Sequence, residues 1–222
     1  MLKIFLDTAN LDSIRQFNDM GLLDGITTNP SLLSKEGGDP KSGMEEITKI
    51  IKGDVSLEVV STEYSGMVEE GKRLRKYGQN VVVKVPMTPD GLRACKTLSS
   101  EGIPVNVTLV FSPNQAILAA KSGAKYVSPF IGRLDDIGQD GMKLIKEIKE
   151  IFSNYSFSTQ ILVASVRHPI HVVEAAKIGA DVVTLPPGVL EKMLKHPLTD
   201  IGLKNFLADW EKLKSTSPDI KI

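Results

Sequence analysis

The chain has 222 residues, of which 41% are hydrophobic and 24% charged, and its 27 basic and 27 acidic side chains give a formal net charge of zero. This length and composition are typical of a soluble globular protein with one large domain and a sizeable core. The lack of a long basic run argues against nucleic acid as a partner, and no apolar run approaches the roughly 20 residues that span a membrane.

Short apolar runs alternate with amphipathic segments along the whole chain. The predicted strands are 4–6, 25–27, 55–60, 81–85, 105–110, 126–131, 161–164 and 181–185, and helical periodicity marks 67–77, 92–98, 142–152 and 172–178. Buried β-branched strands that alternate with helices indicate parallel pairing, and about eight such units close a barrel. We therefore predict a single α/β domain over residues 1–222, a (β/α)8 barrel of TIM type, with an open doubly wound sheet as the alternative.

An additional helix is predicted at 198–213, beyond the eighth unit of the barrel. Its apolar residues recur at steps of three and four, as on one face of a helix. This face either covers the chain's own barrel or packs Phe206 and Trp210 on a neighbouring subunit, because a barrel needs no ninth helix.

Cysteine and histidine are scarce. Cys95 is the single cysteine, which excludes an intramolecular disulfide framework and favours a reducing, cytoplasmic location. His168, His171 and His196 have no ligand partners at metal-site spacing, so we interpret the first two as residues in the first turn of a helix. Dinucleotide, P-loop and serine-hydrolase motifs are also missing, so we expect neither a metal nor an organic cofactor.

Polar side chains stand near the carboxyl ends of the predicted strands, where barrels carry their functional groups. Many form i, i+2 pairs, which place both side chains on one face of a strand. The polar pairs are Thr27 with Asn29, Asn106 with Thr108, and Ser165 with Arg167, and Ser128 with Phe130 has the same spacing. Because the alternate positions are apolar and suit helix cover, we expect the polar ones to point into the barrel.

Lys84 lies within a run of valines that is otherwise suited to a fully buried strand. A buried ammonium group is costly, so it either pairs with a carboxylate or loses its proton. Glu58 and Asp7, on neighbouring strands, are the available partners. Lys84 is therefore either half of a structural ion pair or an amine nucleophile that forms a Schiff base with a carbonyl substrate.

Asp7 and Glu58 are candidates for proton transfer near Lys84. Schiff-base formation expels water and needs a proton shuttle, and carbon–carbon cleavage needs a base at the hydroxyl of the departing fragment. Each carboxylate alone is equally suited to capping or ion pairing, but together with a buried lysine they favour catalysis.

Two arginines follow adjacent predicted strands. Arg133 and Arg167, with Ser165 beside them, fit a bidentate clamp for a phosphate group, although surface arginines are common.

Several of these segments resemble the transaldolase family, and the match runs from Met1 to about Trp210. The matching segments are Asp7-Thr8-Ala9-Asn10, Gly25-Ile26-Thr27-Thr28-Asn29-Pro30-Ser31, Val83-Lys84-Val85-Pro86, Asn106-Val107-Thr108 and Ser128-Pro129-Phe130-Ile131-Gly132-Arg133. The chain is similar in length to the compact branch, which also contains fructose-6-phosphate aldolases. The resemblance implies an α/β barrel that acts on phosphorylated sugars without a metal or organic cofactor. It also implies a homo-oligomer, of the ring-like decamer type in which five-membered rings stack and the C-terminal helix reaches a neighbour.

The resemblance assigns roles to individual residues. It implies that Lys84 forms the Schiff base, that Asp7 acts at the cleaved bond, and that Glu58 and Thr108 hold the shuttling water. The substrate-binding residues that we infer are Thr27, Asn29, Asn106, Ser128, Phe130, Arg133, Ser165 and Arg167.

Three functions remain open at this point. The leading one is a transferase of the pentose phosphate pathway. It moves dihydroxyacetone from sedoheptulose 7-phosphate or fructose 6-phosphate to glyceraldehyde 3-phosphate or erythrose 4-phosphate. The second is a lyase that releases free dihydroxyacetone, and the third is a non-catalytic sugar-phosphate-binding barrel. In the aldolase subgroup, the positions of Glu58 and Phe130 are typically glutamine and tyrosine, so the residues present here favour the transferase.

Overall fold

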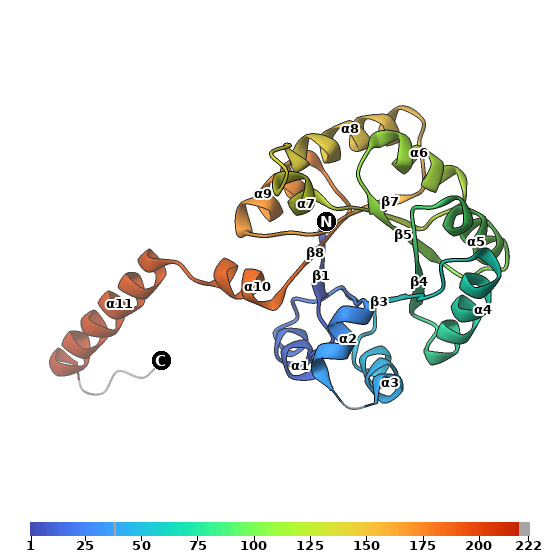
Figure 1. The fold of residues 1–222 in the computed structure, drawn as a ribbon. Coiled ribbons are helices and arrows are strands. Elements are labelled where there is room, and N and C mark those ends of the chain that lie inside the picture. Colours follow the sequence, from blue (N-terminus) through green and yellow to red (C-terminus); the bar gives the residue numbers. More distant parts are fainter. Residues whose placement is uncertain (38, 218–222) are drawn as a thin grey trace.

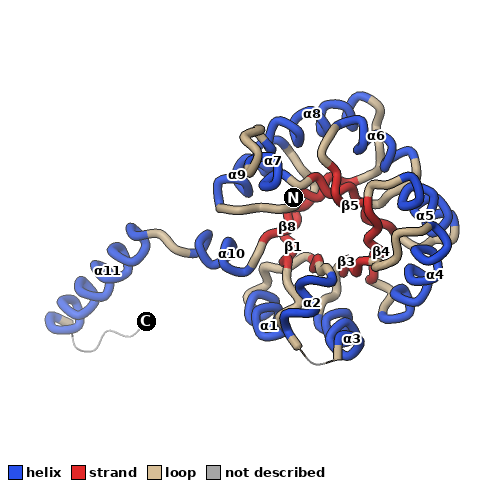
Figure 2. The backbone as a smooth tube through the Cα atoms, in the orientation of Figure 1, coloured by secondary structure: helices blue, strands red, loops and turns tan. Residues whose placement is uncertain are grey.

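The computed structural model describes residues 1–37 and 39–217, and in this part of the chain eight parallel strands close a barrel (Figures 1 and 2). Each strand pairs with its neighbour in chain order, and the first pairs with the last. The strands are β1 (Lys3–Asp7), β2 (Gly25–Thr27), β3 (Asp54–Glu58), β4 (Val81–Pro86), β5 (Val105–Val110), β6 (Tyr126–Pro129), β7 (Gln160–Val163) and β8 (Val182–Leu185). The predicted barrel is confirmed, and the open sheet is wrong.

Helices surround the barrel and alternate with its strands (Figure 2). They are α1 (Leu11–Asp19), α2 (Pro30–Glu36), α3 (Pro40–Ile50), α4 (Tyr64–Leu74), the 3-10 helix η1 (Arg75–Tyr77), α5 (Pro89–Ser100), α6 (Pro113–Lys121), α7 (Ile131–Asp135), α8 (Gly141–Asn154), α9 (Pro169–Ile178), α10 (Pro187–Leu194) and α11 (Pro197–Thr216).

Residues that lie just beyond the strands start the helices. Asn29, two residues after β2, accepts a hydrogen bond from the Leu32 N–H at 2.9 Å, and Pro30 occupies the first turn of α2. An oxygen acceptor followed by proline is a favoured start for a helix. The same arrangement starts α5 at Thr88 and α6 at Ser112. Short loops of this kind hold the carboxyl ends of the strands, and the side chains on them, in fixed positions.

The interior of the barrel is apolar toward its amino end. Phe5 and Tyr126 meet edge to face, with ring centroids 6.0 Å apart, beside buried Val82, Leu162 and Val182. This layer fills the amino end of the barrel as a packed apolar core. The polar side chains further along the same strands therefore lie above this core, toward the carboxyl end of the barrel.

The C-terminal helix is present, but it does not cover the barrel. In Figure 1, α11 projects away from the body of the protein, beyond α10. None of the α11 residues in the described part of the chain is buried, and Phe206 is 74% exposed. The alternative in which this helix covers the chain's own barrel is therefore wrong.

Candidate active site

One cavity opens at the carboxyl ends of the strands, and every predicted site residue except Glu58 lines it. The predicted residues in its wall are Asp7, Thr27, Asn29, Lys84, Asn106, Thr108, Ser128, Phe130, Arg133, Ser165 and Arg167. Glu58 lies beside the cavity and contacts it through Lys84. Residues from most of the strands thus converge on one place, although they are far apart in the sequence.

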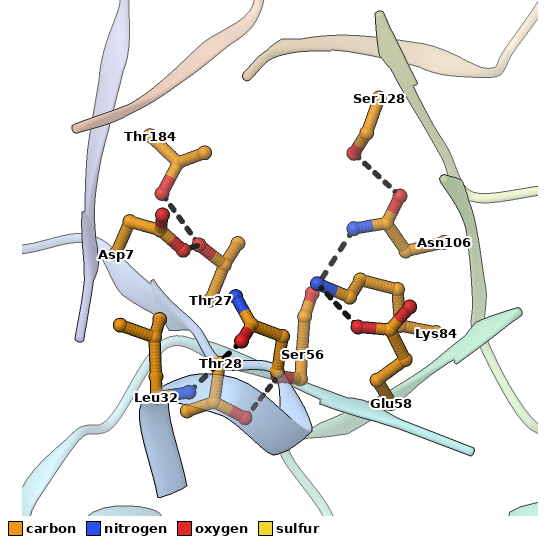
Figure 3. Close-up of polar contacts among 11 residues, drawn as sticks. Asp7, Thr27, Thr28, Leu32, Ser56, Glu58, Lys84, Asn106, Ser128 and Thr184 are labelled. Carbon is orange, nitrogen blue, oxygen red and sulfur yellow. Dashed lines mark hydrogen bonds and ion pairs between the residues drawn. The ribbon is translucent and has the colours of Figure 1, made fainter. Parts of the chain in front are cut away.

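Lys84 and Glu58 form an ion pair inside the barrel (Figure 3). The parallel register places them directly opposite each other on β4 and β3, and Nζ lies 3.1 Å from Oε2. Their side chains are 7% and 17% exposed. Because a buried ion pair gains little net stability after desolvation, stability alone is a weak reason for placing charges here.

Asp7 is held by a chain of hydroxyl groups. The Thr27 hydroxyl donates to Oδ1 of Asp7 at 2.7 Å, and the hydroxyl oxygens of Thr27 and Thr184 are 2.6 Å apart (Figure 3). Burial raises the pKa of Asp7, while the Thr27 hydrogen bond and the charge of Lys84 act in the opposite direction. A carboxyl group with a raised pKa near a buried amine is suited to acid–base chemistry.

Amide and hydroxyl groups line the opposite wall. Asn106 donates to the Ser56 hydroxyl at 3.3 Å and accepts from the Ser128 hydroxyl at 2.7 Å, so its side-chain amide is fixed in orientation (Figure 3). Thr108 is 1% exposed, and its hydroxyl contacts no hydrogen-bond partner within the described residues. Buried polar groups are rarely left unpaired, so this hydroxyl is available to a substrate or water.

The mouth of the cavity is basic. Arg133 stacks on Phe130, with its guanidinium carbon 4.9 Å from the ring centroid, and Arg167 lies 2.8 Å from Asp136. Both arginine side chains are exposed. Planar guanidinium groups at the mouth of a pocket suit a phosphate carried at the end of a substrate.

The predicted backbone around these residues is wrong in two places. β7 ends at Val163 and Ser165 has φ 61, so Ser165 and Arg167 lie in a loop and do not share a strand face. Likewise β6 ends at Pro129, and Phe130 precedes helix α7. Phe130 still forms a parallel bridge with Ala164, whereas Ser165 and Arg167 lie beyond the strand pairing. All three side chains nevertheless line the cavity.

Sequence reasoning missed three residues of the site. Thr184 lines the cavity, Ser56 orients Asn106, and Asp136 binds Arg167. Thr184 and Ser56 each interrupt an apolar strand, which is the signal that identified Thr27 and could have identified them. Asp136 carried no such signal, because it follows a short helix in a loop.

No group of three or more His, Cys, Asp or Glu residues that could hold a metal ion occurs in residues 1–37 and 39–217. Over the same residues, no helix is both long enough and apolar enough to cross a membrane.

Comparison with known proteins adds a family and close relatives. The model of the family described as Transaldolase/Fructose-6-phosphate aldolase matches residues 4–217. The chain is 83% identical over 222 residues to a probable transaldolase of Nitrosopumilus maritimus strain SCM1, with 100% of both chains covered. It is 62% identical over 212 residues to a probable transaldolase of Aquifex aeolicus strain VF5, covering 96% of this chain and 98% of that one.

A solved structure shares the fold. Thiamine phosphate pyrophosphorylase from Pyrococcus furiosus superposes with a TM-score of 0.57 over 83% of this chain and 85% of its own, at 16% identity. At this identity the likeness concerns the barrel alone.

Proposed function

The chain belongs to the transaldolase/fructose-6-phosphate aldolase family, and we propose that it transfers a dihydroxyacetone unit between phosphorylated sugars through a Schiff base at Lys84. The Lys84–Glu58 pair supports the proposal most directly, since Lys84 is a buried amine on the wall of a polar cavity and Glu58 is a proton acceptor 3.1 Å from it. An amine must lose a proton before it attacks a carbonyl, and Glu58 is the nearest group to receive it.

Formation of the Schiff base begins with addition of the Lys84 amine to the ketose carbonyl. The resulting carbinolamine loses its hydroxyl group as water, and that step requires a proton donor. Glu58 supplies this proton through a water bound by the Thr108 hydroxyl, which is buried and free of protein partners among the described residues. The product is an iminium ion, which attracts electrons from the neighbouring carbon–carbon bond.

Cleavage of that bond needs a base on the sugar hydroxyl of the departing fragment, and Asp7 performs this step. Asp7 removes the hydroxyl proton, an aldose phosphate leaves, and the electrons of the broken bond pass into an enamine on Lys84. An acceptor aldose phosphate then reacts by the reverse sequence, in which Asp7 returns the proton. The pKa of Asp7, raised by burial, suits a group that takes and gives back one proton in each cycle.

Substrate position follows from the remaining walls of the cavity. Asn29, Asn106 and Ser128 are placed to bind the sugar hydroxyl groups, and Arg133 and Arg167 with Ser165 bind the terminal phosphate. Thr27 acts on the substrate through Asp7, which it holds by a hydrogen bond. The donors in this scheme are sedoheptulose 7-phosphate and fructose 6-phosphate, and the acceptors are glyceraldehyde 3-phosphate and erythrose 4-phosphate.

Glu58 and Phe130 favour transfer over release of dihydroxyacetone. A transferase must keep the enamine from being protonated before the acceptor arrives. Phe130 brings no hydroxyl donor to the cavity wall, and a glutamate orients water as an acceptor, whereas an amide would also donate. The alternative, a fructose-6-phosphate aldolase, uses the same Lys84 adduct and differs in the fate of the enamine.

A second copy of this chain is the partner that we propose for α11. Its exposed apolar residues are Leu198, Ile201, Leu203, Phe206, Leu207 and Leu213. One long helix that buries none of its residues gains packing only from another molecule, and rings of subunits linked by such helices form a homo-oligomer. Cys95 is buried and is the single cysteine of the chain, a composition that suits a cytoplasmic enzyme.

The test is a partition assay with fructose 6-phosphate as donor. Sedoheptulose 7-phosphate should form when erythrose 4-phosphate is supplied, and release of free dihydroxyacetone should be much slower than transfer. Faster release than transfer would make the protein a lyase. No turnover in either assay would leave only a binding barrel.

A further inference from the structure

Arg167 is bound by residues that do not line the cavity. Its guanidinium Nη2 donates to Oδ2 of Asp136 at 2.8 Å. Its main-chain N–H donates to Nδ1 of His171 at 3.3 Å. Both its side chain and its backbone are therefore held, although the segment that carries it is a loop that follows β7.

His171 is the buried part of this arrangement. The residue is 6% exposed, and its Nε2 lies 3.2 Å from Oδ2 of Asp135. Asp135 in turn accepts a hydrogen bond from the Gly141 N–H at 2.9 Å, which fixes the carboxylate at the start of α8. Because Nδ1 accepts from Arg167, the ring proton lies on Nε2 and is donated to Asp135. Burial lowers the pKa of His171, and the neutral ring that results keeps Nδ1 an acceptor.

Gly132, the residue before Arg133, has no side chain that would clash with Arg167. A Cβ atom on Gly132 would lie 2.6 Å from Nε of Arg167 and 2.2 Å from the Ser165 carbonyl oxygen, which are distances that real atoms do not occupy. The Gly132 N–H donates to the same carbonyl at 3.1 Å. The segment that carries Arg133 and the loop that carries Arg167 are thus packed against each other.

We infer that His171, Asp135 and Asp136 are positioning residues that set the affinity of this site for the substrate phosphate by fixing Arg167. The inference rests on the proposed function, because it takes Arg167 as a phosphate ligand. A guanidinium group has five N–H donors, so Arg167 keeps its bond to Asp136 while other N–H groups face the phosphate. His171, which contacts Asp135 through Nε2, accepts the hydrogen bond from the Arg167 main chain, and Asp136 accepts the one from its side chain. Neither the imidazole of His171 nor the carboxylates of Asp135 and Asp136 need to contact the substrate.

Two variants of His171 distinguish the role of the ring acceptor Nδ1 from that of the ring donor Nε2. The amide oxygen in His171→Asn occupies the position of Nδ1 and still accepts from the Arg167 N–H. The amide nitrogen in His171→Gln reaches the position of Nε2, donates to Asp135 and leaves the Arg167 N–H without its acceptor. We expect the Gln variant to raise KM for fructose 6-phosphate and the inhibition constant of inorganic phosphate by about tenfold, as for loss of one buried hydrogen bond. KM for unphosphorylated fructose and kcat stay unchanged, and the Asn variant stays close to the unmodified protein.

Asp136 gives an independent test at the surface. Asp136→Ala should raise the same two constants by roughly two- to fivefold, since an ion pair between half-exposed groups contributes little. Glu150→Ala, which removes an exposed carboxylate from α8, is the matched control and should change neither constant. Because Asp136 is exposed, this variant folds even if a substitution at buried His171 does not.

Three outcomes distinguish the phosphate-binding role of Arg167 from the positioning role of His171, Asp135 and Asp136. If Arg167→Ala changes KM for fructose and for fructose 6-phosphate equally, the role of Arg167 in phosphate binding is wrong. If Arg167→Ala is selective for the phosphorylated donor, but Asp136→Ala and His171→Gln leave the inhibition constant of phosphate unchanged, the positioning role alone is overturned. Equal loss with His171→Asn and His171→Gln would also overturn it.

Discussion

The Nζ atom of Lys84 lies 3.1 Å from Oε2 of Glu58, on the strand directly beside its own. Lys84 lines the cavity together with Asp7 on the first strand and Thr108 on the fifth, and Glu58 contacts Lys84 from beside it. The pair compensates the charge of a buried amine. In the mechanism that we propose, Glu58 also receives the proton of Lys84 when the amine attacks a carbonyl, so the structural and the proposed chemical role of the lysine are compatible.

The identities of Glu58 and Phe130 should determine how the enamine is partitioned. Glu58→Gln combined with Phe130→Tyr adds an amide donor and a hydroxyl donor near the enamine. We expect the ratio of dihydroxyacetone release to transfer to rise on the order of tenfold. This change corresponds to a shift of about 1.4 kcal/mol in the difference between the activation free energies of the two reactions. The measurement is the ratio of free dihydroxyacetone to transfer product from fructose 6-phosphate, with and without glyceraldehyde 3-phosphate. An unchanged ratio would show that other groups protect the enamine.

Asp7 should cost stability while it supports activity. Its pKa is raised above 3.8 mainly by burial, so the folded protein binds the proton more tightly than the unfolded chain does. The ionised group therefore destabilises the fold above its raised pKa, and this cost fades as pH falls toward 3.8. We expect Asp7→Asn to raise Tm at neutral pH, with a gain that narrows on acidification, while sugar cleavage is lost.

The control for this effect is Asp19→Asn, which neutralises an exposed carboxylate on α1. A gain in Tm that does not depend on pH, or an equal gain in the control, would contradict a role for the ionised Asp7 side chain.

Thr108, like Asp7, should lower the stability of the fold while it supports activity. Its buried hydroxyl has no protein partner within the described residues, so Thr108→Val removes an unpaired polar group and should stabilise the fold by about 1 kcal/mol. Loss of the water that we propose Thr108 binds should lower kcat by about 10²-fold, the lower end for proton transfer by a positioned group. Urea unfolding and steady-state kinetics measure the two effects. Lower stability with normal kcat would remove Thr108 from the proton shuttle.

The exposed face of α11 should control assembly. Phe206→Asp places a charge on the apolar face of this helix and should reduce the molar mass measured by light scattering, while the barrel remains folded by circular dichroism. Leu118→Asp, at an apolar residue of α6 that is 51% exposed, is the matched control and should leave the mass unchanged. An unmodified protein that is already a monomer would contradict the proposed partner of α11.

The strands and most inward-facing residues could be predicted because barrel strands are buried on both faces. In that setting a polar residue such as Lys84 or Asn106 stands out from an apolar run, and alternation fixes which way it points. Prediction failed where the chain leaves the strand. Ser165 adopts a φ of 61°, and Asp136 reaches Arg167 from a separate loop. A periodic sequence pattern indicates neither of these features.

The C-terminal helix illustrates a different limit. Its amphipathic pattern correctly predicts a helix with an apolar face, and α11 extends over Pro197–Thr216. A pattern of this kind does not specify what the face packs against, because an apolar stripe is the same for a barrel and for a neighbouring molecule. Figure 1 shows the helix directed away from the barrel, which only the structure could reveal.

Covalent trapping detects the proposed Schiff base at Lys84. Incubation with fructose 6-phosphate and borohydride should add one dihydroxyacetone unit to the peptide that contains Lys84, as read by mass spectrometry. Lys84→Met should abolish the label and lower kcat by at least about 10³-fold, whereas Lys96→Met, at an exposed lysine of α5, should leave both unchanged. Labelling of another lysine, or sugar cleavage that survives in Lys84→Met, would contradict a Schiff base at Lys84.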